Sequence, residues 1–254
     1  MKQRIIAVSN CKGGVGKTTI AVNLAAGLAR RERRVLVVDA DPQSNATYAL
    51  LGTIAEGLTL HDVVVAGCAR LADVIVSTRS SGVDLVPGHI NLSAADLALA
   101  AVPGRERLLA RKLRDAPEYD YIIVDTPPSL GLMGINSMIA AGEVFVPVGI
   151  GAFALLGIGI LEDTVAQIHD NMEMETPVIT GAIANLYDRT RIADDTLDAL
   201  RAHFGERLFR SVIPRLKDVQ ESQSRATSIF AYAPKSPAAM AYLSLVEEVI
   251  HGEK

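Results

Sequence analysis

Short runs of aliphatic residues alternate with longer stretches of helical period along the whole chain. Two of these runs, residues 35–38 and 122–124, are apolar at successive positions rather than at every second one. Strands show that pattern when helices cover both faces of their sheet, because neither face meets water. The strands expected on this basis are residues 4–9, 34–39, 83–86, 121–125, 143–148, 178–184 and 208–213.

Helical periodicity lies between these strands. The expected helices are residues 18–31, 105–115, 154–171, 193–204 and 237–251. Repeated alternation of strand and helix predicts a doubly wound α/β fold with a mostly parallel sheet. The chain shows no Ser/Gly-rich linker, internal repeat or low-complexity tract, so we expect a single domain spanning residues 1–254.

Composition restricts the possible classes of protein. Of the 254 residues, 49% are hydrophobic and 21% charged, which suits a folded chain with a large core. The net charge of −4 means that any nucleic-acid binding needs a local basic patch. Cys11 and Cys68 are too few for a disulfide scaffold or a four-thiolate metal site. The longest apolar stretch, residues 150–161, is too short to span a bilayer, and we expect no signal peptide ahead of the first strand. We therefore expect a cytoplasmic protein.

A phosphate-binding loop is expected between the first strand and the first helix. Residues 11–19 read Cys-Lys-Gly-Gly-Val-Gly-Lys-Thr-Thr. The glycines let backbone N–H groups turn toward an anion, and the helix N-terminus adds a positive dipole. Lys17 would reach the β- and γ-phosphates, and the Thr18 hydroxyl would complete a Mg²⁺ shell. The expected binding residues are Gly13, Gly14, Val15, Gly16, Lys17, Thr18 and Thr19.

This loop departs from the general phosphate-loop pattern. Cys11 stands where glycine is usual, and Lys12 adds a second lysine at a position that the pattern leaves free. In this respect the loop resembles that of the deviant Walker A ATPases, the ParA/MinD superfamily. The resemblance implies ATP with Mg²⁺ as ligands and a homodimer in which Lys12 reaches the partner's phosphates. An ordinary surface lysine is the alternative.

Three carboxylates are expected beside this loop. Asp39 and Asp41 end the strand 34–39, and strand alternation would turn both toward Mg²⁺ and the γ-phosphate. The resemblance assigns Asp41 to the attacking water and Asp39 to the outer shell of the metal; helix capping is the alternative for Asp41. Asp125 ends the strand 121–125 and would hold Mg²⁺ through water, as a Walker B residue does.

Two further positions match adenine contacts in the superfamily. Asn185 lies just past the strand 178–184, and Pro214 lies just past the strand 208–213. Ordinary turn residues would look the same in the sequence.

Within the superfamily the chain looks closest to small ParA partition ATPases. That resemblance implies non-specific DNA binding by an ATP-bound dimer, association with the nucleoid, and stimulation of hydrolysis by a ParB-like or cargo-adaptor protein. The last helix carries Met240, Leu243, Val246 and Ile250 on one face with acidic neighbours, so it is expected to dock on the core rather than on a membrane. A metabolic ATP-dependent ligase or kinase acting on a small molecule is the alternative function.

A basic segment is the candidate DNA surface. Residues 201–235 hold seven Lys or Arg against three Asp or Glu. Phosphate contact needs such clustering and no base-reading side chains. The candidate residues, in or beside segments that resemble the family, are Arg189, Arg191, Arg215 and Lys217. A solvated mixed-charge face is the alternative.

Two departures from the family pattern lie in this half of the chain. Gly149 stands where the family often has Gln, and residues 223–227 read Gln-Ser-Arg-Ala-Thr where it has a Pro-Ser-x-Gly-Lys-like turn. The sequence leaves open whether nucleotide and DNA contacts there follow the family.

Overall fold

The sheet is wound in both directions from a central strand. The computed structural model describes residues 3–151 and 154–252, and within them the strand order is β3-β4-β2-β5-β1-β6-β7-β8. Neighbouring strands pair in parallel except β3 with β4. The strands are β1 (Arg4–Val8), β2 (Val35–Asp39), β3 (Val76–Ser77), β4 (Val83–Val86), β5 (Tyr121–Asp125), β6 (Gly142–Gly149), β7 (Val178–Tyr187) and β8 (Leu208–Pro214). The expected doubly wound fold is confirmed.

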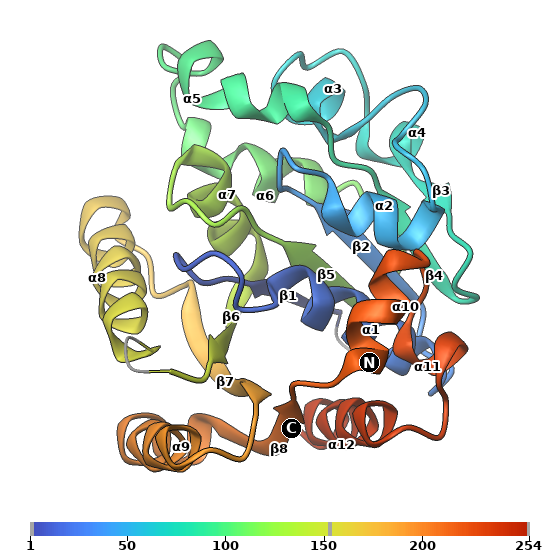
Figure 1. Ribbon diagram of the computed structural model, residues 1–254. Helices are drawn as coiled ribbons and strands as arrows, with labels where there is room; N and C mark the ends of the chain where they lie inside the picture. Colours follow the sequence, from blue (N-terminus) through green and yellow to red (C-terminus); the bar gives the residue numbers. More distant parts are fainter. Residues whose placement is uncertain (1–2, 152–153, 253–254) are drawn as a thin grey trace.

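Helices cover both faces of the sheet. One apolar core lies under α3 (Leu60–Val64), α4 (Leu71–Val74), α5 (Ala95–Ala98), α6 (Leu108–Leu113), α7 (Leu132–Ala141), α8 (Ala154–Met172) and α9 (Arg191–Phe204). The other lies under α1 (Lys17–Ala29), α2 (Asn45–Leu51), α10 (Lys217–Ser224), α11 (Ile229–Tyr232) and α12 (Pro237–His251). In Figure 1, α8 and α9 lie at the left of the sheet, and α12 lies below α1.

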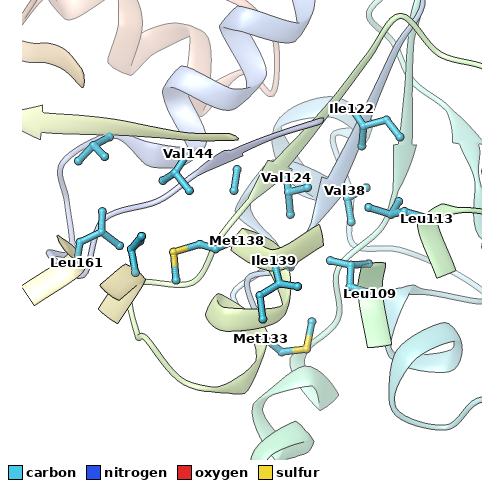
Figure 2. Close-up of a cluster of buried hydrophobic side chains, with 14 of the residues drawn as sticks. Val38, Leu109, Leu113, Ile122, Val124, Met133, Met138, Ile139, Val144 and Leu161 are labelled. Carbon is cyan, nitrogen blue, oxygen red and sulfur yellow. The ribbon is translucent and has the colours of Figure 1, made fainter. Parts of the chain in front are cut away.

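The central strands bury side chains on both faces, which explains their continuous apolar runs. In β2, Leu36 and Val38 enter one core, whereas Val35 and Val37 enter the other. Figure 2 shows one of these faces, where strand residues meet side chains of α6 and α7. The labelled residues there include Val38, Ile122, Val124 and Val144 from the strands and Leu109, Leu113, Met133, Met138 and Ile139 from the helices.

Several expected element boundaries were wrong. β7 continues to Tyr187 and β8 to Pro214, because Asn185 pairs with Gly149 and Tyr187 pairs with Pro214. Asn185 and Pro214 therefore lie inside strands. The helix expected at 105–115 is a 3-10 turn followed by α6, and the two-residue strand β3 was missed.

α12 docks on the core as expected. Of its predicted apolar face, Val246 is buried and Leu243 and Ile250 are partly buried against the core, whereas Met240 is 57% exposed. The buried face is wider than predicted, because Tyr242, Leu245 and Val249 also pack inward. Among residues 3–151 and 154–252, no helix is long and apolar enough to cross a membrane.

Candidate functional site

The glycine-rich loop lies where the sheet changes direction. It follows β1, whose neighbours are β5 on one side and β6 on the other. The chain then leaves through α1 toward β2, whereas β6 leads through α8 to β7. Ligands of open α/β sheets bind at such a switch point, beyond the carboxyl ends of the strands.

The backbone conformation at Gly16 explains why this position of the loop is a glycine. Gly16 has a φ of 87°, in the left-handed region, and a Cβ atom there would lie 2.4 Å from Asn185 Nδ2. Any side chain at this position would be strained and would also displace Asn185. The loop therefore needs glycine immediately before α1 begins at Lys17.

Two buried amide side chains fix the loop to the sheet. Asn10 Nδ2 donates to Pro147 O at 2.8 Å, and Asn10 Oδ1 accepts from Lys12 N at 2.9 Å. From the other side, Asn185 Nδ2 donates to Val15 O at 2.7 Å. The loop is thus held by β6 and β7. Sequence reasoning missed Asn10, which looks there like an ordinary strand end.

The two lysines of the loop occupy different environments. Lys17 is buried, with 7% of its surface exposed, and its Nζ donates to Lys12 O at 3.3 Å. Burial lowers the pKa of Lys17, while the charges of Asp125 and Asp41 act in the opposite direction. The side chain of Lys12 is exposed. Lys17 therefore lies within the loop, and Lys12 projects from it toward solvent.

Asp125 presents an oxygen that suits a cation. Its Oδ2 accepts from Thr18 Oγ1 at 2.7 Å, whereas its buried Oδ1 has no hydrogen-bond partner among the described residues. Burial, together with the nearby charge of Asp39, raises the pKa of Asp125 well above its ordinary value. Mg²⁺ prefers hard oxygen ligands and would offset the cost of burying this carboxylate. The side chains of Thr18 and Asp125 thus fit a magnesium ion.

Asp39 does not face the cavity, contrary to the sequence expectation. It is fully buried, and its Oδ2 accepts from Thr47 N and Thr47 Oγ1, both at 2.7 Å. Its Oδ1 accepts from Asp41 N at 3.2 Å, so the chain turns tightly after β2 and strand alternation ends there. Burial raises the pKa of Asp39 to about 6. Asp39 holds this turn in place, and its outer-shell role stays a prediction.

Asp41, by contrast, lines the cavity. It is 6% exposed, and its Oδ1 accepts from Gln43 N at 2.9 Å. The carboxylate therefore caps its own turn and also faces the space beside the loop. The helix-capping alternative was wrong, because Ser44 and not Asp41 is the N-cap of α2, and the role of Asp41 toward the attacking water stays a prediction.

A cavity of about 620 Å³ extends from the loop across the sheet edge. Residues of the loop line it together with Asn185, Pro214 and residues of α10. A volume of this size is usual for a site that takes a small ligand. Both predicted base-contact residues therefore lie at the cavity, although the Asn185 amide already holds Val15 O.

The four candidate DNA contacts lie near the same edge of the sheet. Arg189 and Arg191 follow β7, and Arg215 and Lys217 follow β8. Arg215 N donates to Tyr187 O at 2.9 Å, which joins the two strand ends, and Arg215 also lines the cavity. All four side chains are exposed, and Lys217 Nζ pairs with Glu221 Oε1 at 2.7 Å.

The remaining cations of the 201–235 segment do not all join them. Arg207 precedes β8, and Arg210 lies in its first half, so the length of β8, about 20 Å, lies between Arg207 and Arg215. Arg201 lies near the C-terminal end of α9, where it pairs with Asp198 at 2.8 Å. The interpretation of the segment as one basic patch was wrong, because a strand crosses the sheet between its ends.

The departures at 223–227 change contacts at the cavity. Gln223 Nε2 donates to Thr19 Oγ1, a link between α10 and the first turn of α1. Ala226, aligned with the glycine of the family turn, has a φ of 48°, in the left-handed region. The turn therefore keeps a glycine-like conformation without glycine. The Gln223 contact was not foreseen, although the departure marked its position.

Known proteins share this architecture and sequence. A family model described as an AAA domain matches residues 3–177. The chromosome partitioning protein ParA of Caulobacter vibrioides is 37% identical over 260 residues, covering 99% of this chain and 95% of that protein. The chain is a member of the ParA/MinD family of P-loop ATPases.

Other members give the same result. The sporulation initiation inhibitor protein Soj of Bacillus subtilis is 38% identical over 249 residues, covering 97% of this chain and 98% of that protein. Among solved structures, cobyrinic acid a,c-diamide synthase from Mycobacterium smegmatis, with bound ATP analogue and magnesium, is 30% identical with a TM-score of 0.82. The structural match covers 98% of this chain and 95% of the synthase chain.

Proposed function

We propose that this member of the ParA/MinD family is a single-domain positioning ATPase. Bound ATP closes two copies face to face, the dimer binds nucleoid DNA without sequence preference, and a ParB-like or cargo-adaptor protein stimulates hydrolysis and release. The observation that carries the proposal is the separation of the two loop lysines, with Lys17 buried in the cradle and Lys12 exposed. The ParA and Soj relatives, similar over nearly their whole lengths, support it.

ATP would occupy the cavity with its phosphates in the loop. The backbone N–H groups of residues 13–19 and the Lys17 ammonium would bind the triphosphate. Thr18 and Asp125 would hold Mg²⁺, which neutralises phosphate charge when bound. Asp41 would orient the attacking water and accept its proton, and Asn185 and Pro214 would contact the base.

The DNA surface would consist of Arg189, Arg191, Arg215 and Lys217. Their exposure at the ends of β7 and β8 suits contact with phosphates rather than with base edges. Because Arg215 also lines the nucleotide cavity, this surface lies close enough to respond to the nucleotide.

Reversal of one of these charges tests the surface. Arg191→Glu, outside the cavity lining, should weaken ATP-dependent DNA binding by about tenfold at low salt while leaving ATP-driven dimerisation intact, because a phosphate contact becomes a repulsion. Co-sedimentation with DNA, with ATP, with ADP and without nucleotide, at low and high salt, measures the effect. Arg207→Glu, at the opposite end of β8 from this surface, is the matched control and should change binding less. Equal losses in both variants, or binding that is insensitive to salt, would contradict the proposed surface.

Lys12→Ala tests the dimer. The loop and Lys17 already bind phosphate within one subunit, so the variant should keep ATP affinity within about threefold. Two triphosphates brought face to face repel each other, and a lysine from each subunit would offset that repulsion. We therefore expect loss of the ATP dimer in light scattering, together with loss of ATP-dependent DNA binding.

Mixing Lys12→Ala with Asp41→Ala refines this test. In the mixed dimer, the site that keeps Asp41 would receive an intact Lys12 from the other subunit, and some hydrolysis should return. Normal ATP-dependent dimerisation of Lys12→Ala alone would show that Lys12 is an ordinary surface lysine.

The similarity to cobyrinic acid a,c-diamide synthase favours a second candidate function, an ATP-dependent ligase or kinase acting on a small molecule. Such an enzyme would release phosphate in response to a small carboxylate acceptor and would need neither DNA nor dimerisation. Measurement of ATP turnover with DNA and with small carboxylic acids, in parallel with light scattering, distinguishes the two functions.

A further inference from the structure

We propose that Gln223 is a positioning residue that turns the Thr19 hydroxyl toward the phosphates of the bound nucleotide. The inference rests on the proposed ATP binding and assigns a role to α10 in it. Gln223 and Thr19 both line the cavity, and Gln223 Nε2 donates to Thr19 Oγ1. They lie 204 positions apart in the chain, so the contact joins two separate elements across the site.

A hydrogen bond from Gln223 Nε2 to Thr19 Oγ1 is the arrangement that the proposal requires, because it leaves the Thr19 proton free. A threonine hydroxyl has one proton to donate and two lone pairs that accept. Because Gln223 donates to the Thr19 oxygen, the proton of Thr19 stays available for another acceptor. The acceptor-rich ligand of this cavity would be a phosphate, which accepts strongly from such a group.

The hydroxyl of the preceding residue, Thr18, donates its proton to a protein carboxylate instead of keeping it for the ligand. Thr18 Oγ1 donates to Asp125 Oδ2 at 2.7 Å, so its proton points toward the metal side of the site. Thr18 therefore belongs to the metal side of the site, and Thr19 would donate to a phosphate of the ligand. A hydroxyl that accepts a hydrogen bond also donates more strongly, because the two bonds polarise each other.

Further hydrogen bonds anchor the backbone at Thr19 and the residue next to Gln223. Thr19 O accepts from Asn23 Nδ2 at 2.9 Å, and Asn23 Oδ1 accepts from Ile229 N at 2.8 Å. On α10, the buried Ser222 donates to Val219 O at 2.8 Å. The Thr19 backbone and the neighbouring Ser222 of α10 are therefore anchored, whereas the Gln223 side chain itself is exposed.

The outer side of α10 carries charged contacts. Glu221 pairs with Lys217 at 2.7 Å and accepts from Tyr232 Oη at 2.6 Å. Arg225 lies 5.3 Å from the centre of the Tyr232 ring. Since α10 begins at Lys217, two residues after Arg215, a ligand that engages Thr19 would also fix the helix that leads from the proposed DNA surface.

This link belongs to the departure from the family pattern. A proline stands at the position of Gln223 in the turn that the segment resembles, and a proline side chain has no hydrogen-bond donor. The relay through Thr19 is therefore expected in this chain.

A double-mutant cycle tests the relay. Binding of ADP and of a slowly hydrolysed ATP analogue is titrated with the unmodified protein, Gln223→Ala, Thr19→Val and the double variant. Gln223→Ala should weaken binding of both nucleotides about three- to tenfold, as for loss of one hydrogen bond. In the Thr19→Val background the same substitution should have no further effect, because the hydroxyl through which it acts is gone.

Matched measurements separate this role from a structural one. Ser224→Ala, on the same turn of α10 but outside the cavity, should bind both nucleotides normally, and thermal melting without nucleotide should be unchanged in Gln223→Ala. Equal affinity of Gln223→Ala and the unmodified protein, or losses that add in the double variant, would overturn the relay alone. Failure of the unmodified protein to bind either nucleotide would overturn the proposed function and the relay with it.

Discussion

Replacement of Lys17 with alanine should lower the affinity for ATP by about a hundredfold or more. The fold already holds the Lys17 ammonium away from water, which lowers its pKa, and the charges of Asp125 and Asp41 oppose that shift. A triphosphate in the loop would gain this cation without the cost of moving it out of solvent. In Lys17→Ala the phosphates would face the loop amides alone.

Equilibrium titration with a fluorescent ATP analogue measures this loss. Lys12→Ala is the natural comparison, because it removes the same charge from the same loop at an exposed position. An affinity of Lys17→Ala within about twofold of the unmodified protein would show that nucleotide binds elsewhere.

Asp41→Ala should slow ATP hydrolysis by about two to four orders of magnitude while leaving nucleotide affinity nearly unchanged. The loop and Lys17, which bind the phosphates, are not altered by this change. ATP should therefore produce a long-lived dimer, visible as a larger species in size-exclusion chromatography.

Asp41→Asn separates the two roles that the structure allows for this residue. An asparagine can still accept from Gln43 N and so preserves the turn, but it cannot take a proton from water. Both variants should hydrolyse ATP slowly. If Asp41→Asn keeps the parental rate, Asp41 does not accept the proton of the attacking water.

The sequence predicted those parts of the fold that depend on local pattern. The strands β4 and β5 match their predicted ranges. A short continuous apolar run such as Ile122–Val124 is typical of a strand whose sheet is covered by helices on both faces. The loop was equally predictable, since glycines and a following helix start carry the phosphate chemistry within nine consecutive residues.

The remainder depends on contacts between distant segments. The turn that draws Asp39 onto Thr47 hides its carboxylate from the cavity, although the strand pattern points it outward. Asn10 and Gln223 act through partners more than 100 positions away, Pro147 and Thr19. Likewise, the basic residues of 201–235 form one cluster in the sequence, whereas β8 separates those before it from those after it in the structure.

The two asparagines that fix the loop affect how nucleotide binding is driven. Asn10 and Asn185 hold its backbone through bonds of 2.7–2.9 Å that involve no ligand. The conformational entropy of the loop is therefore lost during folding, and little of it remains to be lost when a nucleotide arrives. Association of ATP with one subunit should accordingly be a fast, single-step process with little change in backbone hydrogen exchange of the loop. Slower phases would then belong to the meeting of two subunits.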